Sequence, residues 1–146
     1  MDRKELLKRY FAQDGYVKLL GIEIAELTED RAVVRLNVGQ EHLNGNGTVQ
    51  GGMLYTVADF AFALLANYLH PITVTQVGQV TYLKASSAKA IVATATETVR
   101  VGKNTVSEVT VCDEQGEVLC ICHFNGFIKE VSWDDFEEKI VGKVEV

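Results

Sequence analysis

Apolar residues recur along the chain with two periods, one typical of helices and one typical of strands. Near the N-terminus, Leu6, Leu7, Tyr10 and Phe11 repeat at helical spacing, which predicts a short amphipathic helix over residues 3–13. Elsewhere, runs rich in Val, Ile and Thr are separated by short turn-like segments, as expected of antiparallel strands. The predicted strands span residues 19–28, 31–38, 73–85, 89–101, 104–112 and 117–129.

The longest apolar segment predicts a helix over residues 50–69, which ends before Pro71. Such a helix is roughly 30 Å long. Its residues are apolar on nearly every side, and a helix of this kind is normally buried on all sides. We therefore predict an α+β protein in which an antiparallel sheet of five to six strands wraps around one long buried helix.

The C-terminal residues predict a last short helix over residues 132–142. Ser132 and Asp135 have the spacing of a capping box, and Trp133, Phe136 and Ile140 fall on one face. We expect this helical tail to dock on the body of the protein or on a neighbouring subunit.

Composition narrows the picture to one soluble domain over residues 1–146. The chain has 47% hydrophobic and 23% charged residues, enough apolar material for a core. The net charge of −6 argues against nucleic acid as a partner, because phosphate binding needs a basic surface. The N-terminus does not resemble a secretory signal, and the run Val57–Leu65 is too short to span a bilayer, so a cytoplasmic protein with no membrane contact is expected.

The cysteines do not indicate a metal site. Cys120 and Cys122 lie two apart on a predicted strand and so share a face, where small core residues are the simplest interpretation. A zinc site would need further spaced Cys or His pairs, and His123 would point to the opposite face.

One carboxylate interrupts the long helix. Asp59 is the only formally charged side chain between Gln50 and His70. A buried carboxylate without a partner costs several kcal/mol or becomes protonated. Two interpretations are open: the helix turns Asp59 toward a polar seam, or Asp59 is a general base or nucleophile in a cleft.

The start of the same helix is the second candidate. Gly51 and Gly52 leave the first free N–H groups accessible, so a developing oxyanion could bind the backbone amide of Gly51; a flexible hinge is the alternative. Eight residues of helix separate Gly51 from Asp59, which is about 12 Å. One chain cannot bring both groups to one carbonyl. Two antiparallel copies related by a two-fold axis can, so this site requires a dimer with two shared sites.

These residues carry a resemblance. Asn44, Gly47, the run Gln50-Gly51-Gly52 and Asp59 have the spacing found in hotdog-fold acyl-CoA thioesterases of the phenylacetate-pathway (PaaI-like) group, and the likeness extends over residues 17–129. The resemblance implies a hotdog fold, dimers with continuous sheets that often pair into tetramers, and a small-molecule acyl-CoA as substrate.

The resemblance also implies roles for individual residues. Asp59 would activate water or attack the thioester, and Thr75 would help position the water. The amide of Gly51 would polarise the thioester carbonyl, with Asn44 and Gln50 helping to form that half of the site. Asp59 and Thr75 would come from one subunit and the other three residues from its partner. No metal or cofactor would be needed.

Contacts to the substrate and its CoA moiety are expected around the same helix start and in two turns. The expected residues are Gly52, Tyr82, Lys84, Arg100, Gly102 and Lys103. For each cation, an ordinary solvated surface charge is the alternative.

Gln50 departs from the family pattern, because most members carry His at this position. Gln keeps a donor and an acceptor but cannot titrate near neutral pH. The acidic residue is retained, so we expect weakened or redirected activity more than its loss.

Three functions remain open at this point. The first is hydrolysis of an acyl-CoA thioester to a free acid and CoA. The second is hydration or dehydration of an acyl thioester, which generally pairs a His with an acid and is disfavoured by Gln50. The third is a non-catalytic acyl-CoA binding module.

Overall fold

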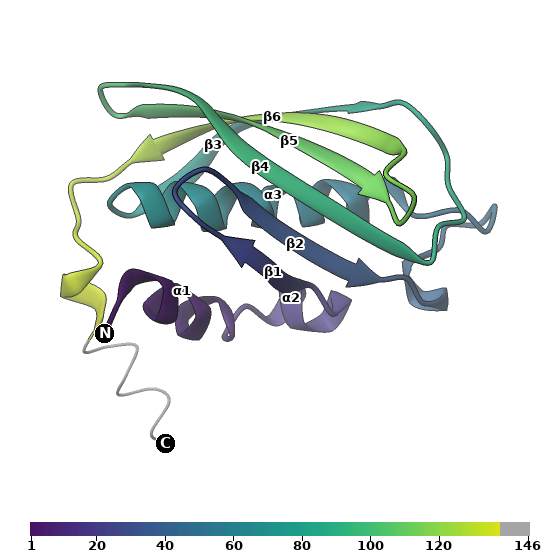
Figure 1. Cartoon of the computed structure of the whole chain (residues 1–146), viewed down its shortest axis with the longest axis horizontal. Coiled ribbons are helices and arrows are strands. Elements are labelled where there is room, and N and C mark those ends of the chain that lie inside the picture. Colours follow the sequence, from purple (N-terminus) through teal and green to yellow (C-terminus); the bar gives the residue numbers. More distant parts are fainter. Residues whose placement is uncertain (138–146) are drawn as a thin grey trace.

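One antiparallel sheet of six strands curls around a long helix, as Figure 1 shows in the computed structural model of residues 1–137. The strand order is β1-β2-β4-β5-β6-β3. The strands are β1 (Glu23–Leu27), β2 (Ala32–Asn37), β3 (Thr73–Tyr82), β4 (Ala90–Val101), β5 (Asn104–Asp113) and β6 (Val118–Ile128). The central helix is α3 (Gly51–Leu69). The predicted fold class and the order of strands along the chain are confirmed.

The N-terminal region differs from the prediction. The expected helix over residues 3–13 ends early, as α1 (Arg3–Phe11), and a second helix, α2 (Gly15–Leu20), replaces the start of the strand expected from residue 19. Asp14 accounts for the second helix, because its side chain accepts hydrogen bonds from the backbone N–H groups of Tyr16 and Val17. Gly21, with φ of +78°, then ends α2 in the left-handed conformation.

The core lies between α3 and the concave face of the sheet. Phe62 of α3 stacks on Phe124 of β6 with ring centroids 5.2 Å apart. Cys120 and Cys122 are fully buried on the inner face of β6, as predicted for small core residues. By length and composition α3 could cross a membrane, but most of it is buried inside the protein.

The prediction that α3 is buried on every side is wrong. Tyr55, Thr56, Asp59 and Ala63 are only half-buried, so they define a face of the helix that the rest of the described chain covers incompletely. The carboxylate therefore lies on a side of α3 that a ligand or a second chain can reach.

Strand β3 forms one edge of the sheet and is exposed along most of its length. Among the described residues it pairs with β6 alone, and Val77 is 57% exposed. A long, partly apolar edge strand is a ready template for pairing with another chain. The opposite edge, β1, is only five residues long and carries Glu23 and Glu26.

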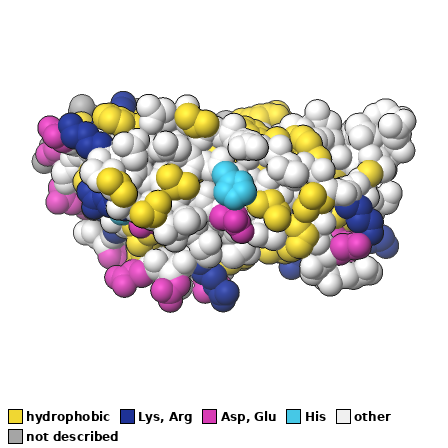
Figure 2. Space-filling model, turned by 90° about the horizontal axis from the view of Figure 1, so that it is seen from above, with side chains coloured by type: hydrophobic (Ala, Val, Ile, Leu, Met, Phe, Trp, Pro, Cys, Tyr) yellow, Lys and Arg dark blue, Asp and Glu magenta, His cyan; other side chains and the backbone are white. Residues whose placement is uncertain are grey.

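The outer face of the sheet mixes apolar and charged groups. Figure 2 shows hydrophobic side chains spread over this face, with a histidine and acidic side chains near its middle. His123 of β6 and Glu108 of β5 form a hydrogen bond here, at 3.2 Å between Nε2 and Oε2.

The C-terminal segment docks on the N-terminal helix, as expected. Trp133 is 2% exposed, and its ring meets that of Tyr10 edge-to-face with centroids 5.0 Å apart. The backbone N–H of Asp134 donates to the Ser132 hydroxyl, and one helical turn follows. The remainder of the helix predicted over residues 132–142, from residue 138, lies outside the described residues.

Candidate active site

Asp59 is held by a hydrogen bond at the open face of α3. The Thr75 hydroxyl of β3 donates to its Oδ1 at 2.9 Å. Burial raises the pKa of the Asp59 carboxyl above its ordinary value, the bond from Thr75 opposes this effect, and the nearby negative charge of Asp14 adds to it. The carboxylate is therefore more basic than one in water, as suits a group that accepts a proton near neutral pH.

The N-terminus of α3 is capped by the residue that departs from the family pattern. Gln50 Oε1 accepts a hydrogen bond of 2.7 Å from the backbone N–H of Met53. Its own backbone N–H donates to the carbonyl of His42 at 2.9 Å. Gln50 thus supports the start of the helix, and its side-chain oxygen is already engaged there.

Tyr82 closes over the same helix end, where the sequence predicted a substrate contact. Its hydroxyl donates to the Gly51 carbonyl at 2.7 Å. A β-carbon on Gly51 would lie 3.1 Å from the Tyr82 ring, and one on Gly52 would lie 3.0 Å from Gln50 Oε1. Both glycines therefore keep the first turn of α3 open between these side chains.

Asn44 orders the loop that leads into the helix. Its Oδ1 accepts from the backbone N–H groups of Asn46 and Thr48, and its Nδ2 donates to the Thr48 hydroxyl at 2.9 Å. His42, just before it, is buried, with Nδ1 accepting from Gly39 N–H and Nε2 bonded to the Leu20 carbonyl. His42 thus has a structural role and does not replace the missing histidine at position 50.

The structure places the two halves of the predicted site apart within one chain. Asp59 and Thr75 lie together, and Asn44, Gln50, Gly51 and Tyr82 surround the start of α3. Because α3 is continuous from Gly51 to Leu69, the separation of about 12 Å remains.

Gly78, which the sequence analysis did not consider, makes room for Tyr55 beside the site. A β-carbon on Gly78 would lie 2.0 Å from the Tyr55 hydroxyl oxygen, so only glycine allows the two elements to approach this closely. Tyr55 also contacts Phe124, with ring centroids 5.5 Å apart. Burial and the charge of Asp59 both raise the pKa of Tyr55. An isolated glycine inside a strand pattern is the signal that could have identified this position.

The predicted CoA-contacting cations are not gathered in one chain. Lys84 follows β3 and pairs with Glu117 at 2.6 Å, while Lys103 pairs with Glu130 at 2.9 Å. Arg100 Nε donates to the carbonyl of Gly102, whose φ of +60° forms the turn between β4 and β5. This turn lies at the Thr73 end of the sheet, about 30 Å from the Tyr82 end by the length of β3.

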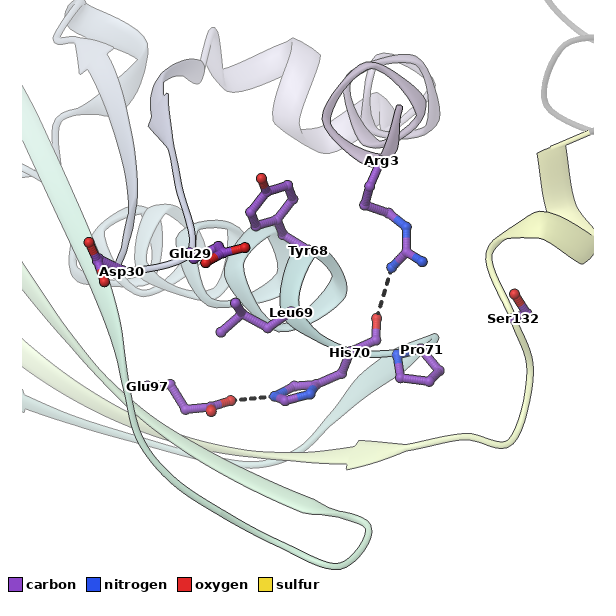
Figure 3. Close-up of a pocket in the computed structure, with 9 residues that line it drawn as sticks. All are labelled: Arg3, Glu29, Asp30, Tyr68, Leu69, His70, Pro71, Glu97 and Ser132. Atoms are coloured by element: carbon purple, nitrogen blue, oxygen red, sulfur yellow. Dashed lines mark hydrogen bonds and ion pairs between the residues drawn. The ribbon is translucent and has the colours of Figure 1, made fainter. Parts of the chain in front are cut away.

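A cavity lies at the C-terminal end of α3, as Figure 3 shows. Its volume is about 850 Å³, and its lining includes Arg3, Glu29, Asp30, His70 and Glu97. Arg3 Nη1 donates to the carbonyls of Asn67 and His70, each at 3.1 Å, and so caps the C-terminus of the helix. The groups predicted to carry chemistry do not line this cavity, and about 16 Å of helix separates His70 from Asp59.

Within residues 1–137 there is no group of three or more His, Cys, Asp or Glu side chains placed to hold a metal ion. The residues of the candidate site can transfer a proton at Asp59 and form hydrogen bonds at the start of α3.

Comparison with known proteins gives the same fold and family. A family model described as a domain of unknown function (DUF4442) matches residues 3–127. A putative esterase of Archaeoglobus fulgidus is 34% identical over 105 residues, which cover 70% of this chain and 68% of that protein. The acyl-coenzyme A thioesterase PaaI of Escherichia coli is 28% identical over 112 residues, or 76% of this chain and 80% of that protein.

Solved structures of related proteins have the same fold. The Escherichia coli PaaI protein from the phenylacetic acid degradation operon superposes with a TM-score of 0.82 at 24% identity, over 88% of this chain and 94% of that one. A mutant of the phenylacetic acid degradation protein PaaI of Thermus thermophilus gives a TM-score of 0.74 at 30% identity, over 78% of this chain and 98% of that one. The chain belongs to the DUF4442 family and to the PaaI-like group of hotdog-fold thioesterases.

Proposed function

We propose that this protein hydrolyses an acyl-CoA thioester to the free acid and CoA at a site shared between two copies of the chain. The observation that carries the proposal is the half-buried Asp59 carboxylate, fixed by Thr75 on the open face of α3. The names of its relatives, a putative esterase and an acyl-CoA thioesterase, support the reaction class.

In the proposed mechanism Asp59 acts as the general base. It takes a proton from a water molecule while the water oxygen attacks the thioester carbon, and Thr75 orients the carboxylate. The negative charge that develops on the carbonyl oxygen is stabilised by the free N–H of Gly51 at the positive end of the α3 dipole. The C–S bond then breaks, and the departing thiolate receives the proton from Asp59. Direct attack by Asp59 on the thioester is the alternative route.

Strand β3 supplies the interface in this proposal. Its exposed edge can pair with the same strand of a second copy around a two-fold axis, which continues the sheet and removes the edge. The antiparallel arrangement places Asp59 of one chain opposite Gly51 of the other. The partly apolar outer face of the sheet then remains available for two dimers to pair into a tetramer (Figure 2).

The same two-fold symmetry would bring the separated cations of the two chains close together. Pairing β3 strands in opposite directions brings the Tyr82 end of one chain next to the Thr73 end of the other. Lys84 of one copy then approaches the turn of the second copy that carries Arg100 and Lys103. Their surface ion pairs with Glu117 and Glu130 are worth little, so CoA phosphates can replace these carboxylates.

The replacement of His by Gln50 is compatible with turnover in this mechanism. The Gln50 oxygen caps α3, a structural task that does not require a titrating group, and the proton-transfer step depends on Asp59. A non-catalytic acyl-CoA binding module would leave the Asp59–Thr75 pair without a role.

A thiol-release assay over a panel of acyl-CoAs tests the proposal. The unmodified protein is expected to release CoA, and Asp59→Asn is expected to reduce kcat by about 10²–10⁴ while the fold is preserved. CoA binding without thiol release from any acyl-CoA in the panel would indicate the binding module. Full activity of Asp59→Asn would exclude Asp59 as the base.

A further inference from the structure

The first turn of α3 begins with two glycines, Gly51 and Gly52. Glycine loses more backbone freedom on folding than any other residue, so a helix that starts this way does not hold its own first turn firmly. A backbone N–H group stabilises a developing negative charge well only if its direction is fixed before the reaction. The surrounding residues therefore have to supply the rigidity that the two glycines lack.

The peptide bond before Gly51 is held by Gln50. The backbone N–H of Gln50 donates to the His42 carbonyl at 2.9 Å, and Gln50 Oε1 accepts from the Met53 N–H at 2.7 Å. His42 is itself buried and hydrogen-bonded at both ring nitrogens, so it is a fixed support. These contacts fix the N-terminal side of Gly51 and leave its C-terminal side to another group.

The peptide bond after Gly51 is held by Tyr82, the last residue of β3. The Tyr82 hydroxyl donates to the Gly51 carbonyl at 2.7 Å. The ring also packs closely on the glycine, since a β-carbon on Gly51 would lie 3.1 Å from it. Burial raises the pKa of Tyr82 above its ordinary value, so the hydroxyl stays protonated and keeps donating at neutral pH. Gly51 is thus held on both sides, by Gln50 through one peptide bond and by Tyr82 through the other.

We infer that Tyr82 is a positioning residue for the proposed reaction, whose hydroxyl holds the Gly51 peptide so that the Gly51 N–H stays directed at the thioester carbonyl oxygen. This inference rests on the proposed hydrolysis. It replaces the substrate contact expected for Tyr82 with a support for the group that makes such a contact. Tyr82 is 51% exposed, so its hydrogen bond acts locally on the first turn of α3 and contributes little to the stability of the whole fold.

Tyr82→Phe tests this role, because it keeps the ring and removes only the hydroxyl. Removing an oxyanion donor outright lowers kcat by about 10²–10³, and loosening one should cost less, so we expect kcat to fall by roughly tenfold. KM and the midpoint of urea unfolding should not change, because no substrate contact and little stability are lost. Tyr16→Phe, at an exposed tyrosine of α2, is the matched control and should leave kcat unchanged. A raised KM with kcat intact, an unchanged kcat, or a kcat loss accompanied by a lower unfolding midpoint would overturn the inference.

A measurement without turnover separates this inference from the proposed reaction. ¹⁵N relaxation reports the order of the Gly51 amide directly. In Tyr82→Phe its order parameter should fall from the rigid range, about 0.85, toward about 0.6, whereas Tyr16→Phe should leave it unchanged. Lower order in Tyr82→Phe, with no thiol release by the unmodified protein from any acyl-CoA, would refute the hydrolysis and support the hold of Tyr82 on Gly51. Unchanged order in Tyr82→Phe would refute that hold even if thioesters are hydrolysed.

Discussion

Replacing Thr75 with valine isolates the hydrogen bond that holds Asp59. The Thr75 hydroxyl lies 2.9 Å from Asp59 Oδ1, and a hydrogen bond to a charged group contributes about 1.5–3 kcal/mol. Asp59 is half-buried, so the lower end of that range is appropriate. About 1.5 kcal/mol corresponds to roughly a tenfold fall in kcat/KM, since 1.36 kcal/mol is a factor of ten.

Thr75→Val should also change how the rate depends on pH. The Thr75 bond lowers the pKa of Asp59 against the upward effect of burial, so its removal raises that pKa further. The acid limb of the pH–rate profile should therefore move to higher pH in Thr75→Val. Thr75→Ser keeps the hydroxyl and should stay close to the unmodified protein in both rate and profile.

Thiol release measured from pH 4.5 to 9 for the three proteins checks this reasoning. An unshifted acid limb in Thr75→Val would show that the bond does not tune the base. Equal damage in Thr75→Ser would show that the methyl packing of Thr75, and not its hydroxyl, matters.

Asp59→Asn should raise Tm by about 2–4 °C at neutral pH, because it removes a partly desolvated charge whose burial costs on the order of 1 kcal/mol. The gain, measured by thermal unfolding, should vanish below the ordinary aspartate pKa, where Asp59 is protonated in both the folded and the unfolded state. Gly78→Ala should lower kcat/KM at least tenfold, since its β-carbon displaces Tyr55; unchanged kinetics would place Tyr55 outside the site. Burial acts to raise the pKa of Glu97, but hydrogen bonds from Thr105 and His70 prevail and lower it. Glu97→Gln should therefore destabilise the fold by about 1–2 kcal/mol in urea titrations at neutral pH. The difference in stability between the two proteins should fade as the pH drops through the lowered pKa. Gln50→Ala should cost about 1 kcal/mol of stability by removing the α3 cap, and an unaltered unfolding midpoint would contradict the capping role.

The sequence predicted the strands and the central helix because both have strong periodic signals. The strands expected over 104–112 and 117–129 correspond to β5 and β6 within about one residue at each end. The boundary near residue 19 was wrong because Asp14 and Gly21 cap a short helix, and such local hydrogen bonds outweigh a weak apolar pattern.

The site was predictable only in part. The placement of Thr75 beside Asp59 agrees with the expectation from the family resemblance. The role of Gln50 as a cap could not be read from its spacing, since it depends on where its side-chain oxygen points. The open face of α3 was also missed, because a helix that is apolar on all sides gives no sign of which side its own chain leaves uncovered.

Subunit mixing shows whether each active site is built from two chains. Asp59→Asn removes the base, and Gly51→Val blocks the amide, because even a single β-carbon there lies 3.1 Å from Tyr82. Each variant alone should be inactive.

After random subunit exchange, half of the dimers contain one chain of each kind, and each of these has one intact site assembled from Asp59 of one chain and Gly51 of the other. Thiol release should then recover to roughly a quarter of the unmodified rate. A mixture that remains inactive, although mass spectrometry shows that the subunits have exchanged, would contradict a site built from two copies.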